Sequence, residues 1–127
     1  MMKKLAVTFM ASAALVATVS PLTALAHHSQ AMYTNADGAI SITGVVQKFE
    51  FTNPHAAIYL EVIDSDGKTQ LWICEMQSIR ALKLLGWLPT TVKAGDKLVI
   101  VGRPARNGAP AMYAEAIQLP DGRAMRS

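Results

Sequence analysis

The chain has 127 residues, of which 51% are hydrophobic, and this is the size of one compact domain with its own core. Twelve basic and nine acidic side chains give a formal net charge of +3 at pH 7. Cys74 is the only cysteine, so an internal disulfide is excluded and the fold must be stabilised by an apolar core.

Residues 1–26 have the pattern of an export leader. Lys3 and Lys4 give a positive start, residues 5–19 form an apolar stretch, and Ala24-Leu25-Ala26 is an A-x-A cleavage site. The apolar stretch is shorter than the roughly 20 residues that a membrane span needs. We therefore predict a cleaved signal peptide, a periplasmic location and no membrane span after processing.

Cleavage would leave residues 27–127 as a single domain of 101 residues. Lys3 and Lys4 leave with the leader, so ten basic side chains then face nine acidic ones. A chain so close to neutral has no basic stripe for a phosphate backbone, and we expect no nucleic-acid partner.

The first half of this domain has the pattern of β-strands. Residues 27–35 show no hydrophobic period and are expected to form an N-terminal arm. Alternating apolar residues then predict strands over residues 39–51, 56–63 and 68–75. Gly44 predicts a bend or bulge in the first strand. Cys74 lies in the apolar run of the third strand, which favours burial over metal ligation or an intermolecular disulfide.

The hydrophobic period changes after the third strand. Apolar residues recur every three positions at Ile79, Leu82 and Leu85, which predicts a helix of about three turns over residues 76–85 that ends at Gly86. Two further strands are expected over residues 97–103 and 111–119. Five strands with a helix between the third and fourth predict an all-β fold, an OB-like five-stranded Greek-key barrel with one short helix. An SH3-like barrel is the nearest alternative.

Cleavage after Ala26 would make His27 the N-terminal residue. Its α-amine and its imidazole then form a bidentate nitrogen chelate, and a second imidazole completes the three-nitrogen set called a histidine brace, which suits Cu(II). His28 offers a second mode, in which the amine, a deprotonated amide and the imidazole of position two bind the ion. The candidate for the distant imidazole is His55, which follows Asn53-Pro54 at the end of a strand.

Two other residues are candidates for accessory roles at such a site. Asn53 could orient the His55 ring as a neighbour of the ligand. Met32, four residues after His28, could add a soft sulfur ligand. The alternative is that His27 and His28 are solvated side chains of the arm, and that His55 is a strand-end histidine bonded to a carbonyl.

The motifs of the chain resemble those of a family of small exported proteobacterial proteins of unknown function. The residues that carry this resemblance are His27-His28-Ser29, Thr43-Gly44-Val45-Val46, Asn53-Pro54-His55, Leu85-Gly86-Trp87, Ala94-Gly95-Asp96 and Gly102-Arg103-Pro104-Ala105. The resemblance spans the whole mature chain. It implies a periplasmic β-barrel-like domain and no assigned activity.

Two functional hypotheses follow. The first is a periplasmic protein that holds Cu(II), or else Ni(II) or Zn(II), for copper handling or delivery. We expect no enzyme, because the serines lie in no nucleophile motif and the glutamates occur singly. The second is a metal-free interaction module that binds an exported protein partner or a small ligand through Tyr59, Trp72 and Arg103 on the barrel face.

Overall fold

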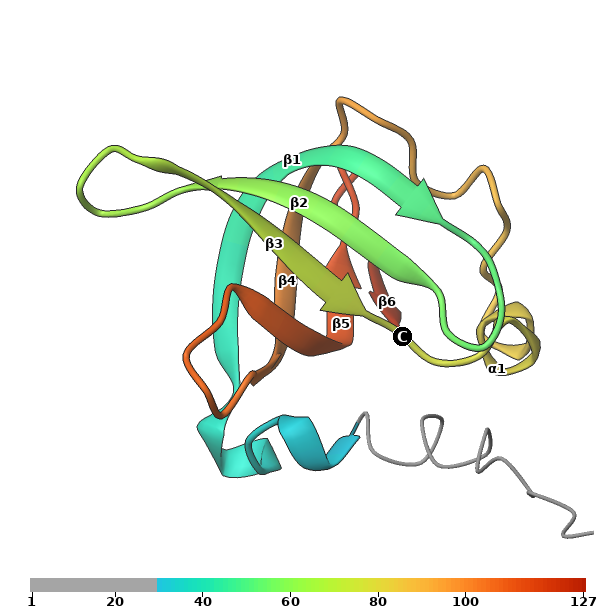
Figure 1. Ribbon diagram of the computed structural model, residues 1–127. Helices are drawn as coiled ribbons and strands as arrows, with labels where there is room; N and C mark the ends of the chain where they lie inside the picture. The colour runs from blue at the N-terminus through green and yellow to red at the C-terminus, as the bar shows by residue number, and fades with distance from the viewer. Residues whose placement is uncertain (1–29) are drawn as a thin grey trace, which may run out of the picture.

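The structure is a computed structural model that describes residues 30–127 of the chain (Figure 1). Its elements are the 3-10 turns η1 (Gln30–Met32) and η2 (Ala36–Gly38), the strands β1 (Ile40–Glu50), β2 (Ala57–Ile63), β3 (Thr69–Glu75), β4 (Lys97–Pro104), β5 (Ala111–Gln118) and β6 (Ala124–Arg126), and the helix α1 (Ile79–Leu84). Each end of the five predicted strands lies within one residue of the observed end.

Five of the strands close into a barrel. The first half of β1 pairs antiparallel with β4 and its second half with β2, so one long strand serves two neighbours. β3 pairs antiparallel with β2 and parallel with β5, and β5 returns to β4. With α1 between β3 and β4, this is the topology of the OB fold, and the predicted fold class is confirmed. The short strand β6, which was not predicted, adds to β5.

Gly44 lies where β1 changes its neighbour. The next residue, Val45, pairs with Lys97 of β4 and with Glu61 of β2. A Cβ atom at position 44 would lie 2.3 Å from the backbone oxygen of Glu61, so only glycine allows the two strands to approach this closely. The register irregularity itself follows at Gln47, and β1 curves around the barrel as predicted (Figure 1).

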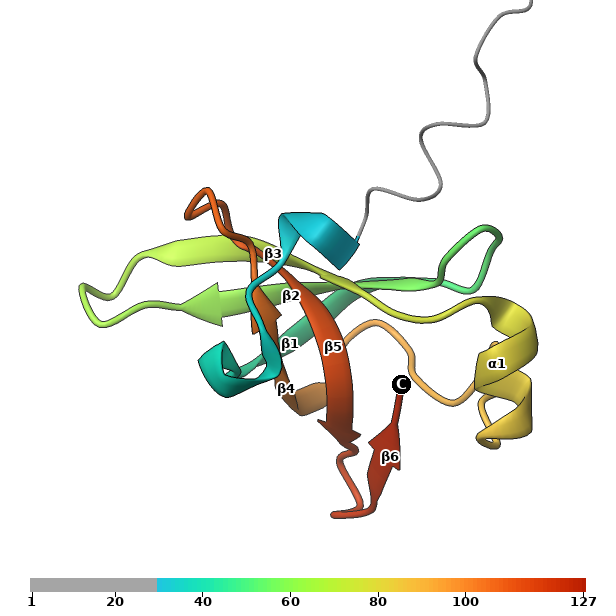
Figure 2. The ribbon, with the colours of Figure 1, turned by 90° about the horizontal axis from the view of Figure 1, so that it is seen from below.

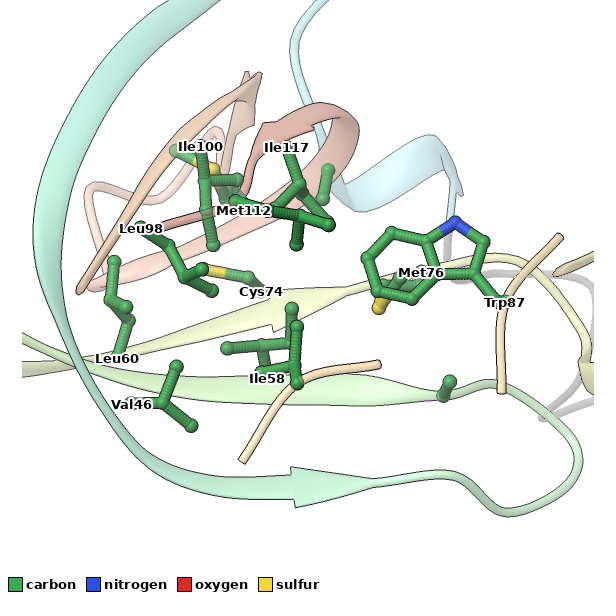
Figure 3. Packing of buried hydrophobic residues seen from close by; sticks show 14 of the residues in the cluster. Val46, Ile58, Leu60, Cys74, Met76, Trp87, Leu98, Ile100, Met112 and Ile117 are labelled. Carbon is green, nitrogen blue, oxygen red and sulfur yellow. The ribbon is translucent and has the colours of Figure 1, made fainter. Parts of the chain in front are cut away.

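Alternate residues of the strands point inward and form one apolar core (Figure 3). The largest buried side chains are Trp87, Ile58, Leu60, Met76, Leu82, Leu98, Ile100, Met112, Ile117, Val46 and Cys74. The predicted burial of Cys74 is confirmed, because the residue is 0% exposed. Burial raises the pKa of its thiol to about 12, so the sulfur is neither a thiolate ligand nor accessible to a second chain.

The helix is shorter than predicted. α1 begins at Ile79, because the backbone of Met76 still donates to the carbonyl of Ala56 and prolongs the pairing of β2 with β3. Ser78 then caps the helix by accepting from the amide of Ala81. Within the helix only Leu82 is fully buried, and Leu85 is 40% exposed. The helix therefore buries a narrower apolar face than the three-residue spacing of apolar residues predicts.

The end of the helix and the residue after it close one end of the barrel. Gly86 has φ of +92° and ends the helix as predicted. Trp87 follows with its ring fully buried, 6.0 Å from the ring of Phe49, and its indole N–H donates to the carbonyl of Arg126 at 2.7 Å. Within residues 30–127, no helix has the length and hydropathy required to cross a bilayer.

Gly44→Ala should destabilise the barrel by about 1–3 kcal/mol, because the added methyl meets the backbone of β2 rather than a movable side chain. Urea unfolding followed by tryptophan fluorescence measures this. Thr43→Ala, at the exposed neighbouring position of β1, is the control and should change the free energy of unfolding far less. Equal stability of Gly44→Ala and the wild type would show that the close approach of β1 and β2 is not required.

Candidate functional site

His55 lies in the loop between β1 and β2 and is held there by a backbone hydrogen bond. Its Nδ1 is 2.9 Å from the carbonyl oxygen of Met76. A carbonyl can only accept, so Nδ1 donates the proton, and in the neutral ring Nε2 is then left unprotonated. The predicted bond from a strand-end histidine to a carbonyl is therefore present. It is also the arrangement that fixes the tautomer of a histidine that binds a metal ion through Nε2.

Glu75 is the acidic neighbour of this ring. It ends β3, one residue before Met76, and its Oε1 is 3.7 Å from Nδ1 of His55. Its Oε2 accepts a hydrogen bond of 2.8 Å from the hydroxyl of Tyr33. The side chains of His55 and Glu75 are 26% and 20% exposed, so both are partly shielded but reachable by solvent. We call His55, Glu75, Tyr33 and Tyr113 the His55 cluster.

Two tyrosines complete this cluster. Tyr113 of β5 is in register with Glu75, and its ring centroid lies 5.9 Å from that of Tyr33. Burial, followed by the hydrogen bond to Glu75 and its charge, raises the pKa of Tyr33 far above its usual value. Burial and the charge of Glu75 also raise the pKa of Tyr113, although Arg103 and a hydrogen bond with the Gln30 side chain oppose this shift. Both phenols are therefore neutral hydroxyl groups at pH 7.

The described part of the N-terminal arm is docked beside this cluster. Tyr33 forms an isolated bridge with Ala105, and Thr34 donates its amide to the carbonyl of Pro104. Arg106 donates its amide to the carbonyl of Met32, and its Nε donates to the carbonyl of Tyr33 at 2.8 Å. Figure 2 views this side of the barrel and shows η1 next to β3 and β5. The arm is therefore anchored by backbone hydrogen bonds as well as by the tyrosine hydroxyl.

The other residues predicted for the metal site are His27, His28, Met32 and Asn53. His27 and His28 lie outside the described residues. Met32 is 56% exposed, and what it contributes to the contacts of the arm is its backbone carbonyl. Asn53 is exposed at a shallow hollow beside Ile79, and the group that orients His55 is the carbonyl of Met76. Within residues 30–127, no three His, Cys, Asp or Glu side chains are grouped as a metal site.

The structure does not bring Tyr59, Trp72 and Arg103 to one face of the barrel. Tyr59 points outward and its hydroxyl donates to Glu50 at 3.3 Å. Trp72 is paired in register with buried Leu60, so it lies on the inner face of the sheet, opposite to that of Tyr59, and packs against the core. Arg103 lies on β4, with its guanidinium 5.0 Å from the ring of Tyr113. Tyr59 is paired with Ile73, the residue next to Trp72. Successive residues of a strand point to opposite faces, so Tyr59 and Trp72 do too, and the three side chains cannot form one surface.

Glu75 and Tyr33 were missed by the sequence analysis. Glu75 is one of several single glutamates on predicted strands, and Tyr33 is separated from it by 42 residues. Their contact depends on the pairing of β3 with β5, which no local pattern specifies. The one signal available was the position of Glu75 at the end of a strand whose partner begins just after His55.

Residues 14–113 match the "Family of unknown function (DUF6152)". The chain belongs to this family. Among solved structures, a mitochondrial single-stranded DNA binding protein from S. cerevisiae, Rim1, is similar with 15% sequence identity and a TM-score of 0.48, over 68% of this chain and 93% of that chain. No curated protein matches the chain significantly.

Tyr33→Phe should loosen the N-terminal arm, because it removes the hydrogen bond between the phenol and the Glu75 carboxylate. We expect the amides of Thr34 and Arg106 to exchange about tenfold faster, which corresponds to about 1.4 kcal/mol of local stability. Hydrogen exchange measured by nuclear magnetic resonance reports both amides. Tyr59→Phe removes a different tyrosine–glutamate bond and should leave them unchanged. Unchanged exchange in Tyr33→Phe would mean that the backbone bonds alone hold the arm.

Proposed function

We propose that this DUF6152 protein is an exported, periplasmic protein that holds Cu(II) at its mature N-terminus, for copper handling or delivery rather than catalysis. His27 would supply its amine and imidazole, and His55 the second imidazole. The single observation that supports this most is the docking of residues 30–34 beside a histidine whose Nδ1 is hydrogen-bonded to a carbonyl.

The length of chain between the docked arm and the proposed N-terminus permits this arrangement. The carbonyl of Gln30 accepts from the amide of Tyr33, and the hydroxyl of Tyr33 donates to Glu75, the neighbour of His55. Two residues, His28 and Ser29, separate Gln30 from His27, and the three Cα–Cα steps between them span at most roughly 10 Å. This short length of chain supports placing the amine of a mature N-terminus near the His55 ring.

The chemistry of these ligands favours Cu(II). Two imidazole nitrogens and an α-amine form a neutral nitrogen set, and copper has the highest affinity for such a set among the divalent first-row ions. The α-amine has an ordinary pKa of about 7.7–8.0, so the ion displaces a weakly held proton near neutral pH. Ni(II) and Zn(II) should bind in the same place with lower affinity.

Charge on the barrel supports our inference that nucleic acid is not the partner. OB folds that bind oligonucleotides use the outward face of strands 2 and 3. Here that face bears Glu61 of β2 and Glu75 of β3, and the neighbouring Tyr59 hydroxyl donates to Glu50. These carboxylates would repel a phosphate backbone.

The test is a Cu(II) titration of the exported protein, purified after expression of the full chain and checked by mass spectrometry for a first residue of His27. Calorimetry reports the affinity, and electron paramagnetic resonance reports the number of nitrogen ligands. His27→Ala keeps the α-amine but removes the adjacent imidazole, and it should weaken binding at least tenfold. His55→Ala should weaken binding at least tenfold as well.

His28→Ala separates the two possible binding modes. It should leave the affinity nearly unchanged if His27 and His55 form the brace, and it should abolish tight binding if position two is the ligand. A wild-type protein that binds Cu(II) weakly, with an affinity that is unchanged by the loss of either His27 or His55, would refute the proposed function.

A further inference from the structure

The edge of β3 that faces away from β2 is paired over only part of its length. Its last three residues, 73–75, are in register with β5. Residues 69–72 have no strand partner on that side within residues 30–127, and we call them the open edge. They belong to the β2–β3 hairpin, whose tip projects beyond the barrel (Figure 1). β3 therefore closes the barrel at its end and leaves an unpaired edge at its start.

The open edge has free backbone groups on two residues. The amide of Asp64 donates to the carbonyl of Lys68, so the even-numbered residues of β3 direct their backbone groups toward β2. The amide of Ile73 donates to the loop before β5, so the odd-numbered residues face the other way. Thr69 and Leu71 are the odd-numbered residues before Ile73, and within residues 30–127 their amides and carbonyls form no backbone hydrogen bond. These groups are free to pair with another strand.

The side chains of this edge do not protect it. Proteins block open edges with charged residues or proline, and residues 69–74 contain neither. Leu71 and Ile73, on the outer face of β3, are 48% and 43% exposed. Ile63, which pairs with Thr69 from β2, is 70% exposed. The edge is therefore apolar and uncharged as well as unpaired.

We propose that two copies of this protein pair through their open edges and form a two-fold symmetric dimer with one continuous sheet. The two β3 strands run antiparallel, with Thr69 of each copy opposite Leu71 of the other and Gln70 opposite its own equivalent. Each Thr69–Leu71 pair exchanges both of its backbone hydrogen bonds, as in any antiparallel ladder. The two-fold axis passes through the Gln70 pair.

The free backbone groups select this register. If Leu71 lay opposite Leu71, Thr69 would face Ile73, whose amide already donates to the loop before β5. If Thr69 lay opposite Thr69, Leu71 would face Gly67, whose amide already donates within the hairpin turn. The proposed register alone pairs every free amide with a free carbonyl.

Charge complementarity favours a second copy as the occupant of the open edge. In this register Lys68 of one copy lies opposite Trp72 of the other. Lys68 has no carboxylate within ion-pair distance in the part of the chain that the structure describes, and an indole ring attracts an ammonium group. At the axis, two Gln70 amides meet without the repulsion of like charges. An extended segment of another protein would pair with the same backbone groups but would offer no specified partner for Lys68 or Gln70.

A single cysteine tests the register. Opposite residues of a non-hydrogen-bonded antiparallel pair have Cα atoms about 4.5 Å apart, which a disulfide can join. Gln70→Cys should therefore give a disulfide-linked dimer after mild oxidation, seen as a doubled mass in non-reducing electrophoresis. Thr69→Cys is the matched control and should cross-link at least tenfold less, because its equivalent in the second copy lies on the diagonal. Native Cys74 is 0% exposed and does not compete.

Analytical ultracentrifugation of the purified protein tests the dimer itself. Leu71→Lys should raise the dissociation constant of the dimer at least tenfold, because it places charges beside the axis. Val101→Lys, at a position of β4 that is 38% exposed and outside the open edge, should leave the constant unchanged. Circular dichroism confirms that each variant is folded.

Three results would overturn the inference. A monomeric wild type would leave the open edge to an extended segment of another protein. A dimer that Leu71→Lys does not weaken would have its interface elsewhere. A folded Gln70→Cys variant that cross-links no better than Thr69→Cys would exclude the proposed register.

Discussion

The parallel pairing of β3 with β5 is the constraint on which both the barrel and the His55 cluster depend. Like the pairing of β1 with β4, it joins strands that are not consecutive in the chain, and it closes the sheet. In its register, Cys74 faces Met112, and both side chains are buried in the core. Glu75 faces Tyr113 in the next pair, on the outer side where the arm docks. A slip of one residue would exchange core and surface, so the same register that completes the core also places the carboxylate.

The barrel could be predicted from sequence because each strand has a local pattern of alternating apolar residues and is bounded by turn residues. Gly44 and Gly86 were informative for the same reason, since each is required by one local geometry. The start of the helix could not be found from periodicity, because the pairing of β2 with β3 extends to Met76 and competes with helix formation. That Tyr59 and Trp72 point to opposite faces could be predicted from sequence, because counting pairs back from the hairpin turn places the tryptophan opposite an inward-pointing leucine. The contact of Tyr33 with Glu75 joins positions 42 residues apart and has no local signature.

The proposed site is complete only when the N-terminus is free. Within residues 30–127, His55 is the candidate ligand, and on this account the amine and ring of His27 are the rest of the site. Copper loading would then follow cleavage of the leader and could not precede it. A docked arm also lowers the entropic cost of binding, because most of the segment leading to the amine is ordered before the ion arrives. The polar contacts at Tyr33 and Arg106 would thus contribute to affinity without touching the metal.

The most direct test of this account is a crystal structure of the exported protein loaded with Cu(II). We predict one ion bound by the α-amine and ring nitrogen of His27 and by Nε2 of His55, with Nδ1 of His55 still donating to Met76. An ion held by the N-terminal residues alone, with the His55 ring unligated, would contradict the central claim.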